Sequence, residues 1–312
     1  MDAALLLTAA NEACPKPQTV EHLAAAEVVG VDRLVVVQNK IDMCDRATCE
    51  AHHAALRAFL DGTVGEDAPV IPLSAQFGYN LDVLLDALVA LPEPDRDEAA
   101  PARMVVIRSF DVNKPGTKWD RLVGGIAGGS VTQGVFEVSQ KVEIRPGLVS
   151  KAADGSLVAT PLTTTVTSLQ SEKNRLGAAH PGGLIGMGTG LDPALTRGDA
   201  LVGQVIGAAG TLPPVYKSLV VSVRLLHRVV GDAAERRVDR PRKGESLLLS
   251  VGALSVTATV AAAHKSKAKL ALSLDRPVCA AAGDTIPISR RTDNSWRLIG
   301  IATLVEGETL VD

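Results

Sequence analysis

The hydrophobic pattern changes its period once, near residue 92, and this change constrains the fold more than any other feature of the chain. Before it, apolar runs alternate with segments whose apolar residues recur at helical spacing. After it, short Val, Ile and Leu runs are separated by turns of Gly, Pro and Asp. The first pattern is typical of a parallel sheet covered by helices, and the second of β-barrels. We therefore predict an α/β part followed by an all-β part.

Three apolar runs in the first part predict strands, at residues 3–10, 33–38 and 69–73. Helices are expected after each of them. The predicted N-cap residues are Thr19, Asp45 and Asn80, and the predicted helix stops are Gly30, Gly62 and Pro92. The resulting order β-α-β-α-β-α implies a parallel sheet.

Two proline-rich segments divide the chain. Residues 92–101 (PEPDRDEAAP) are polar and predict a linker, and Leu212-Pro213-Pro214 predicts a second break. We predict an α/β domain at 1–91, a linker at 92–102, and two β-barrel domains, II at 103–211 and III at 212–312.

The composition excludes several classes of protein. The net charge is -3, so any contact with nucleic acid must come from local basic residues, and 3% aromatic residues are too few for rows of stacked bases. Four cysteines are too few for a disulfide framework and favour a reducing compartment. No apolar run reaches the roughly 18 residues of a membrane span, so no membrane partner is predicted.

Asn39, Lys40 and Asp42 follow the predicted strand 33–38 in the pattern Asn-Lys-x-Asp. Ligands of parallel sheets bind at the carboxyl ends of the strands. The Asp42 carboxylate can accept hydrogen bonds from the N1–H and the 2-amino group of guanine, an edge that adenine lacks. Asn39 can meet the acceptor side of the base and tie the adjoining loops together, and the stem of Lys40 can lie over the ring.

A second set of residues, Ser74, Ala75 and Gln76, follows the next predicted strand. The backbone N–H of Ala75 is the expected donor to guanine O6. Two such loops on consecutive strand ends predict a guanine-binding site. The alternative is that Asn39 and Asp42 only form a turn before a helix.

Longer strings make the chain resemble one family. They occur in order along essentially the whole chain, as NEACPKPQT (11–19), QNKID (38–42), RSFDVNKPG (108–116), GGIAGGS (124–130), RPGLVSK (145–151), PGGLIG (181–186), VGQV (202–205), SRR (289–291) and WRLIG (296–300). Together they resemble the gamma subunit of eukaryotic and archaeal translation initiation factor 2. The resemblance implies a GTP-binding domain followed by two β-barrels, with GTP or GDP and Mg²⁺ as ligands.

The resemblance also implies partners. A protein of this family in its GTP state binds initiator methionyl-tRNA and brings it to the small ribosomal subunit in the cytoplasm. It is the core of a heterotrimer, with the alpha subunit on the second domain and the beta subunit on the GTPase domain. Two alternatives stay open: a truncated, non-catalytic module that binds a partner or tRNA, and another tRNA-carrying elongation-factor-like GTPase. The strings at 11–19 and 145–151 argue against the latter.

The phosphate side of such a site has no candidate residues in these 312 residues. No G-x-x-x-x-G-K-[ST] motif occurs, and that motif would supply the phosphate contacts and the Mg²⁺ ligand. From the order of motifs in the family we expect the phosphate loop, the switch segments and the catalytic His to precede Met1. Residues 1–91 would then be the second half of a GTP-binding domain, strand 3–10 an apolar sheet edge, and guanine-nucleotide affinity low. No catalytic residue is predicted.

Two surface segments are candidate tRNA or partner contacts. The resemblance suggests Asn113 and Lys114, for which a simple turn is the alternative. The charge suggests Arg236, Arg237, Arg240, Arg242 and Lys243, for which a solvated loop is the favoured alternative. The glycines of GMGTG (186–190) lack a following helix and predict a barrel turn rather than a dinucleotide site. Cys44, Cys49 and the histidines show no metal-ligand spacing, so no metal site is predicted.

Overall fold

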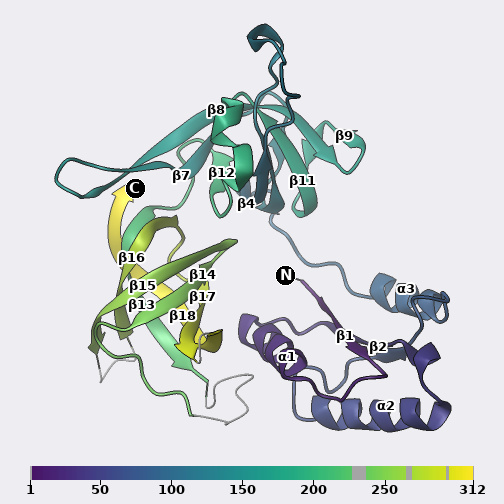
Figure 1. Ribbon diagram of the computed structural model, residues 1–312. Coiled ribbons are helices and arrows are strands. Elements are labelled where there is room, and N and C mark those ends of the chain that lie inside the picture. The colour runs from purple at the N-terminus through teal and green to yellow at the C-terminus, as the bar shows by residue number, and fades with distance from the viewer. Residues whose placement is uncertain (1, 227–236, 265–268, 293–294, 312) are drawn as a thin grey trace. The chain divides into compact units, whose positions relative to one another are not determined.

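The computed structural model describes residues 2–226, 237–264, 269–292 and 295–311 (Figure 1). Residues 2–94 contain a parallel sheet with the strand order β1-β2-β3. The elements of this part are β1 (Ala4–Ala9), α1 (Pro17–Val29), β2 (Leu34–Asn39), the 3-10 helix η1 (Ile41–Met43), α2 (Arg46–Leu60), β3 (Val70–Pro72) and α3 (Leu81–Val89). The predicted α/β part is confirmed, with each strand within one or two residues of its expected position.

The central strand β2 carries the core of this part. Its residues Leu34 to Val37 are each at most 5% exposed. Leu6 and Val36 pack against Leu23 of α1 and Leu56 of α2 in one apolar cluster, and Figure 1 shows both helices beside these strands. An unbroken apolar run is what a strand covered on both faces requires, which is why its position could be predicted.

The strand β1 lies at one edge of the sheet. Among the described residues it pairs only with β2, in parallel register from Ala4 opposite Leu34 to Ala9 opposite Asn39. Leu6 is buried on one face, whereas Leu5 and Leu7 are 40% and 57% exposed. The predicted apolar edge at 3–10 is therefore present in the described part of the chain.

The helix ends follow the predicted caps in part. Asp45 accepts a hydrogen bond from the Thr48 N–H and Gly30 ends α1 in a left-handed conformation, as predicted. Thr19 is not an N-cap, because α1 already begins at Pro17, whose fixed φ suits the first helical position. Asn80 precedes α3 as predicted, but its side chain donates to the Pro72 carbonyl and does not cap the helix.

A first β-barrel follows the segment after α3. Its strands are β4 (Arg103–Phe110), β5 (Ile126–Gln133), β6 (Phe136–Glu137), β7 (Lys141–Lys151), β8 (Leu157–Ser171), β9 (Asn174–Leu176), β10 (Ala178–Ala179), β11 (Gly182–Thr189) and β12 (Val205–Ala208), with short 3-10 helices η2 (Trp119–Arg121), η3 (Pro193–Leu195) and η4 (Arg197–Asp199). The main sheet runs β11-β5-β4-β12-β7-β8-β9, and an additional pairing of β11 with β8 closes it.

A second closed barrel has the strand order β13-β16-β15-β14-β17-β18. Its strands are β13 (Val215–Leu225), β14 (Ser246–Val251), β15 (Leu254–His264), β16 (Lys269–Cys279), β17 (Thr285–Thr292) and β18 (Ser295–Val311). Alternate residues point inward, and Leu247, Leu249 and Val251 of β14 are accordingly buried. The predicted α/β part followed by two β-barrels is thus confirmed.

The glycine-rich string GMGTG lies in a strand. Gly186 and Gly188 belong to β11, so the predicted barrel location is right and the predicted turn is wrong. β11 pairs on both sides, with β5 and with β8. A Cβ on Gly188 would lie 2.4 Å from the Ser168 Oγ, so close packing between strands explains this glycine.

A buried ion pair holds the segment that leads from the first barrel into the second. The Arg145 Nε donates to the Glu143 Oε1 at 2.7 Å, and both side chains are almost fully buried on β7. The Arg145 Nη1 also donates to the carbonyls of Leu212, at 3.3 Å, and Pro213, at 3.1 Å. The other Glu143 oxygen accepts from the Gly210 N–H at 2.9 Å. This network fixes residues 210–213 against the first barrel.

No helix within the described ranges combines the length and the apolar character that crossing a membrane would need.

Candidate functional site

The two predicted loops meet at the carboxyl ends of β2 and β3. These strands are parallel neighbours, with Gln38 opposite Pro72, so the residues that follow them emerge at the same sheet edge. The Asn39 Oδ1 accepts from the Lys40 N–H at 2.7 Å and from the Ala75 N–H at 3.1 Å. The expectation that Asn39 ties the two loops together is confirmed by the second of these bonds.

The first loop has an unusual backbone. Lys40 adopts a left-handed conformation, with φ 62° and ψ 33°. This conformation is energetically unfavourable for residues other than glycine, asparagine and aspartate. This turn reverses the chain into the 3-10 helix η1 and presents Asp42 on its surface. The Asp42 carboxylate is exposed, and within the described ranges it has no hydrogen-bond or ion-pair partner. Both oxygens are therefore able to accept from a ligand.

The second loop is a closed turn. Ser74 is buried, and its Oγ accepts from the Phe77 N–H at 3.3 Å, while its backbone pairs with that of Tyr79. Ala75 and Gln76 are exposed at the tip. The Ala75 N–H, the expected donor to guanine O6, donates to Asn39 in this structure, so it would have to be shared with or released to a base. Ser74 lies beneath the turn and shapes it.

Two residues support these loops through hydrogen bonds that were not predicted from the sequence. Gln38 is 1% exposed, and its Nε2 donates to the Cys49 carbonyl at 2.8 Å and to the His52 Nδ1 at 3.2 Å. Asn80 donates from Nδ2 to the Pro72 carbonyl at 2.7 Å. A polar residue at the end of an otherwise apolar strand was the available signal for Gln38. Its partners, however, lie on α2 and could not be read from the local pattern.

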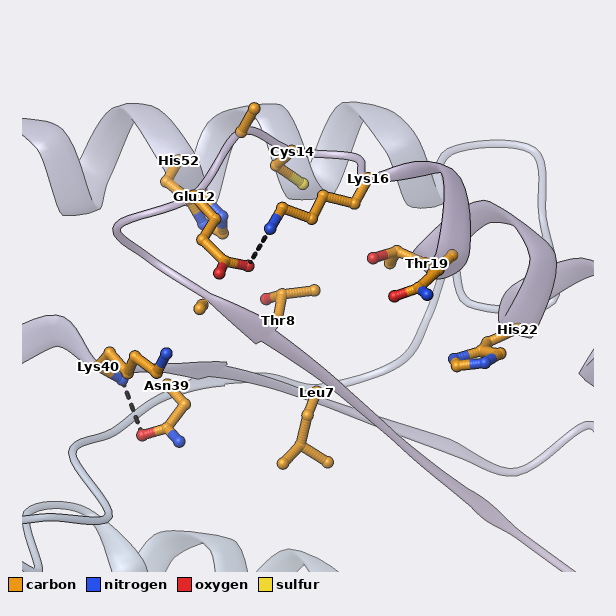
Figure 2. A pocket seen from close by; sticks show the side chains of 13 residues that line it. Leu7, Thr8, Glu12, Cys14, Lys16, Thr19, His22, Asn39, Lys40 and His52 are labelled. Atoms are coloured by element: carbon orange, nitrogen blue, oxygen red, sulfur yellow. Dashed lines mark hydrogen bonds and ion pairs between the residues drawn. The ribbon is translucent and has the colours of Figure 1, made fainter. Parts of the chain in front are cut away.

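A pocket of about 400 Å³ adjoins the first loop. It is lined by the end of β1, the loop after it, Asn39 and Lys40 of the first loop, and His52 of α2. Figure 2 shows the loop that carries Glu12, Cys14 and Lys16 across this space from Asn39 and Lys40. The Lys16 Nζ lies 2.8 Å from the Glu12 Oε2.

Charges and burial set the protonation of this pocket. The hydrogen bond from Lys16 and, more weakly, the charge of Lys40 hold the pKa of Glu12 below its usual range. Burial lowers the pKa of His52, and the neighbouring His53 adds to that effect. The Gln38 amide donates to its Nδ1, which the neutral imidazole accepts. Burial raises the pKa of the Cys14 thiol.

The structure places the remaining predicted contact residues on the surface. Arg237, Arg240, Arg242 and Lys243 are exposed, and Arg236 lies outside the described residues. The Asn113 side chain donates to Asp111 Oδ1 and to the Val123 carbonyl and accepts from the Val123 N–H, so it pins its own loop. Lys114 is exposed beside it.

No cluster of three or more His, Cys, Asp or Glu side chains suited to a metal ion occurs in the described part of the chain.

Family models match both ends of the chain. Residues 1–94 match the model "Elongation factor Tu GTP binding domain", and residues 217–304 match "Initiation factor eIF2 gamma, C terminal". The first match includes both loops of the candidate site.

Curated relatives match nearly the whole chain. It is 47% identical to eukaryotic translation initiation factor 2 subunit 3 of Drosophila melanogaster, over 99% of this chain and 66% of that protein. It is also 47% identical to translation initiation factor 2 subunit gamma of Methanocaldococcus jannaschii, over 97% of this chain and 74% of that protein. The Schizosaccharomyces pombe gamma subunit is 45% identical, over 99% of this chain and 70% of that protein.

Solved structures share the fold at low sequence identity. The translation elongation factor SelB of Methanococcus maripaludis, in complex with the GTP analogue GppNHp, gives a TM-score of 0.76 at 20% identity, over 99% of this chain and 66% of that one. A bacterial selenocysteine-specific elongation factor gives 0.74 at 19% identity, over 97% of this chain and 44% of that one.

Proposed function

The chain belongs to the family of translation initiation factor 2 gamma subunits, and from this premise we propose that it binds the guanine base of GTP or GDP through its two strand-end loops. The observation that carries the proposal is the Asn39 side chain, which bridges to the Ala75 N–H and so holds both loops at one sheet edge. This bridge leaves the exposed Asp42 carboxylate free to accept from the base.

Each predicted site residue has a role in this proposal. Asp42 accepts from the N1–H and the 2-amino group of guanine, and the stem of Lys40 covers the ring. Asn39 positions the loops and offers its amide to the base. The Ala75 N–H, which donates to the Asn39 Oδ1 in this structure, is shared between that oxygen and O6 of the base. Gln76 flanks it at the exposed tip, and Ser74 maintains the turn beneath them. Adenine would leave the Asp42 carboxylate unsatisfied, so guanine is preferred.

In the cell, we propose that the chain acts in translation initiation in the cytoplasm, with the alpha and beta subunits, initiator methionyl-tRNA and the small ribosomal subunit as partners. The proposed domains are 1–91 for guanine binding, a linker at 92–102, and barrels at 103–211 and 212–312. Exposed Arg237, Arg240, Arg242 and Lys243, and the loop of Asn113 and Lys114, are the proposed tRNA or partner contacts. Such contacts would weaken with salt.

The printed sequence contains no phosphate-loop motif, so no residue is assigned to phosphate, Mg²⁺ or hydrolysis. A second candidate function is a non-catalytic module whose barrels bind a partner or tRNA. The elongation-factor alternative is less well supported, because the elongation-factor structures share about 20% identity with the chain whereas the initiation-factor relatives share 45–47%.

Base selection tests the proposal without requiring tight binding. Saturation-transfer NMR with GDP and ADP at equal concentration should show contacts to the guanine base and little signal from adenine. Asp86→Ala, which removes an exposed carboxylate on α3, is the control and should bind GDP as the unaltered chain does. Equal signals from the two bases, or none from either, would contradict guanine binding and leave the partner-binding module as the better candidate.

A further inference from the structure

Two cysteines lie at the start of helix α2, next to the turn that carries Asp42. Cys44 immediately precedes the N-cap Asp45, and Cys49 is the fourth residue of the helix. Residues at these two positions often pack against each other and fix the angle at which the chain enters a helix. The pair is usually apolar, whereas here both members are thiols.

The two cysteines lie beside the same backbone carbonyl group. The Cys49 Sγ donates to the Ile41 carbonyl oxygen at 3.7 Å. The Cys44 N–H donates to the same carbonyl at 3.4 Å. The N-cap bond from the Thr48 N–H to Asp45, at 2.7 Å, holds the first turn of α2 in place between them. Both cysteines are partly exposed, so a small oxidant can reach them.

We propose that Cys44 and Cys49 form an oxidation site at which hydrogen peroxide converts the two thiols to a reversible disulfide. One thiolate attacks a peroxide oxygen and the O–O bond breaks, which gives a sulfenic acid and, after protonation, one water. The other thiol then attacks the sulfenic sulfur, the S–S bond forms, and the hydroxyl group leaves with the released proton as a second water. Two S–H bonds are lost and the peroxide takes up two electrons.

The surroundings of the pair agree with a resting dithiol. Burial, together with the neighbouring Cys44 and the carboxylates of Asp45 and Glu50, raises the pKa of Cys49. The Cys49 thiol is therefore mostly protonated near neutral pH. Oxidation would tie the turn η1, and with it Asp42, to the first turn of α2. A disulfide of this kind, in a protein from a reducing compartment, is of the transient type.

Cys14 and Cys279 are the internal comparisons. Cys279 is buried, its thiol donates to the Pro213 carbonyl at 3.3 Å, and burial raises its pKa to about 12, so it is expected to stay reduced. Cys14 is half-buried at the pocket beside the guanine loop. Neither is expected to pair under conditions that link Cys44 to Cys49.

Trypsin provides a direct readout, because Arg46 separates the two cysteines. Cleavage after Lys40, Arg46 and Arg57 gives peptides 41–46 and 47–57, each with one cysteine. The folded full chain is treated with hydrogen peroxide, free thiols are alkylated, and the digest is analysed by mass spectrometry. We expect the two peptides joined, lighter than their sum by two hydrogen atoms, and separated again by dithiothreitol. The Cys14→Ser and Cys279→Ser variants should give the same linked pair.

Other outcomes would overturn the proposal. One is separate oxidation of both cysteines to sulfinic acids, and another is a linkage of either cysteine to Cys14 or to a second chain. Oxidation of the chain unfolded in concentrated guanidinium chloride is the control for sequence proximity. If the fold brings Cys44 and Cys49 together, the unfolded chain should form this disulfide less selectively. An equally selective Cys44–Cys49 disulfide in the unfolded chain would therefore also contradict the proposal. The measurement needs no nucleotide, so its result does not depend on whether the chain binds guanine.

Discussion

Asn39 and Asp42 perform different tasks although they lie in one tetrapeptide. Asn39 is engaged within the protein, where its Oδ1 accepts from two backbone N–H groups. Asp42 is exposed and without a partner in the described part of the chain. The left-handed turn at Lys40 separates Asn39, which joins the two loops, from Asp42, which we propose accepts hydrogen bonds from the base.

Asp42→Asn should change which base is preferred. An amide offers one acceptor and one donor, which match the N1–H and the 2-oxo group of xanthine, whereas the carboxylate matches the two donors of guanine. We expect GDP binding to fall by about 10- to 100-fold and xanthosine diphosphate binding to rise. Competition between the two nucleotides in saturation-transfer NMR measures both changes. A variant that loses both ligands equally would show only that the loop had been damaged.

His52 should make the α/β part sensitive to mild acid. Burial lowers the pKa of His52 in the folded protein, so the unfolded chain takes up this proton first as the pH falls. The contribution of neutral His52 to the free energy of unfolding is therefore fully present above the unfolded pKa of about 6.5, and it is lost progressively below that pH. Thermal unfolding, followed by circular dichroism of the helices, should show a lower midpoint at mildly acidic pH. His52→Gln should reduce that change, and His22→Gln, at an exposed histidine, should not.

At the scale of elements, the sequence does not show which glycines the β-sheets require. Gly128 and Gly129 are adjacent in β5, yet a Cβ on Gly129 would lie 2.0 Å from the Val105 carbonyl oxygen, whereas one on Gly128 would have its nearest neighbour at 3.7 Å. Nothing in the string GGIAGGS distinguishes the two, because the neighbouring strand that approaches comes from a distant part of the chain.

Gly129→Ala should therefore destabilise the first barrel and Gly128→Ala should not. The backbone of β4 must move to admit the methyl group, at an expected cost of about 3 kcal/mol or more. The free energies of unfolding in urea of both variants, measured side by side, provide the comparison. Similar values for the two would mean that the strands adjust more easily than their close approach suggests.

The elements that could be predicted from the sequence are those with a local cause. β2 is an unbroken apolar run that two covered faces require, and Asp45 is a cap that a nearby N–H satisfies. The predicted start of α1 is three residues late because Pro17 was assigned to a loop, although proline suits a first helical turn. The bonds of Gln38 and Asn80 were missed because their partners lie on other elements. The position of the two loops at one sheet edge could be predicted because each follows directly from its own strand.

At the scale of the whole molecule, one buried ion pair fixes the segment between the barrels. Burial opposes the charge of Glu143 most strongly, but the Gly210 N–H and the Arg145 guanidinium outweigh it and hold the pKa of Glu143 below its usual range. The pair thus stays charged inside the protein, and the Arg145 Nη1 also donates to the carbonyls of Leu212 and Pro213.

Arg145→Met should leave the Glu143 carboxylate buried without its partner, at a cost of about 3–5 kcal/mol. The double variant Glu143→Met/Arg145→Met should be less destabilised than Arg145→Met, because no charge then remains unpaired. Lys151→Met, which removes an exposed charge from the same strand, is the control. Urea unfolding of the three variants measures the differences in free energy of unfolding. If Arg145→Met is no less stable than Lys151→Met, the ion pair does not stabilise this segment.

The apolar edge of β1 should govern how the full chain associates. Leu5 and Leu7 are 40% and 57% exposed, and the outer backbone groups of an edge strand can pair with a strand of another chain. Leu7→Lys should therefore reduce self-association in sedimentation velocity, since a charge at an edge opposes such pairing. Leu184→Lys, at an exposed leucine of β11, should leave it unchanged.

A fragment of residues 101–312, which lacks this edge, should stay monomeric at concentrations where the full chain associates. If the full chain is instead monomeric and as stable as the barrels alone, the α/β part folds stably by itself, and the exposed edge of β1 causes neither association nor loss of stability.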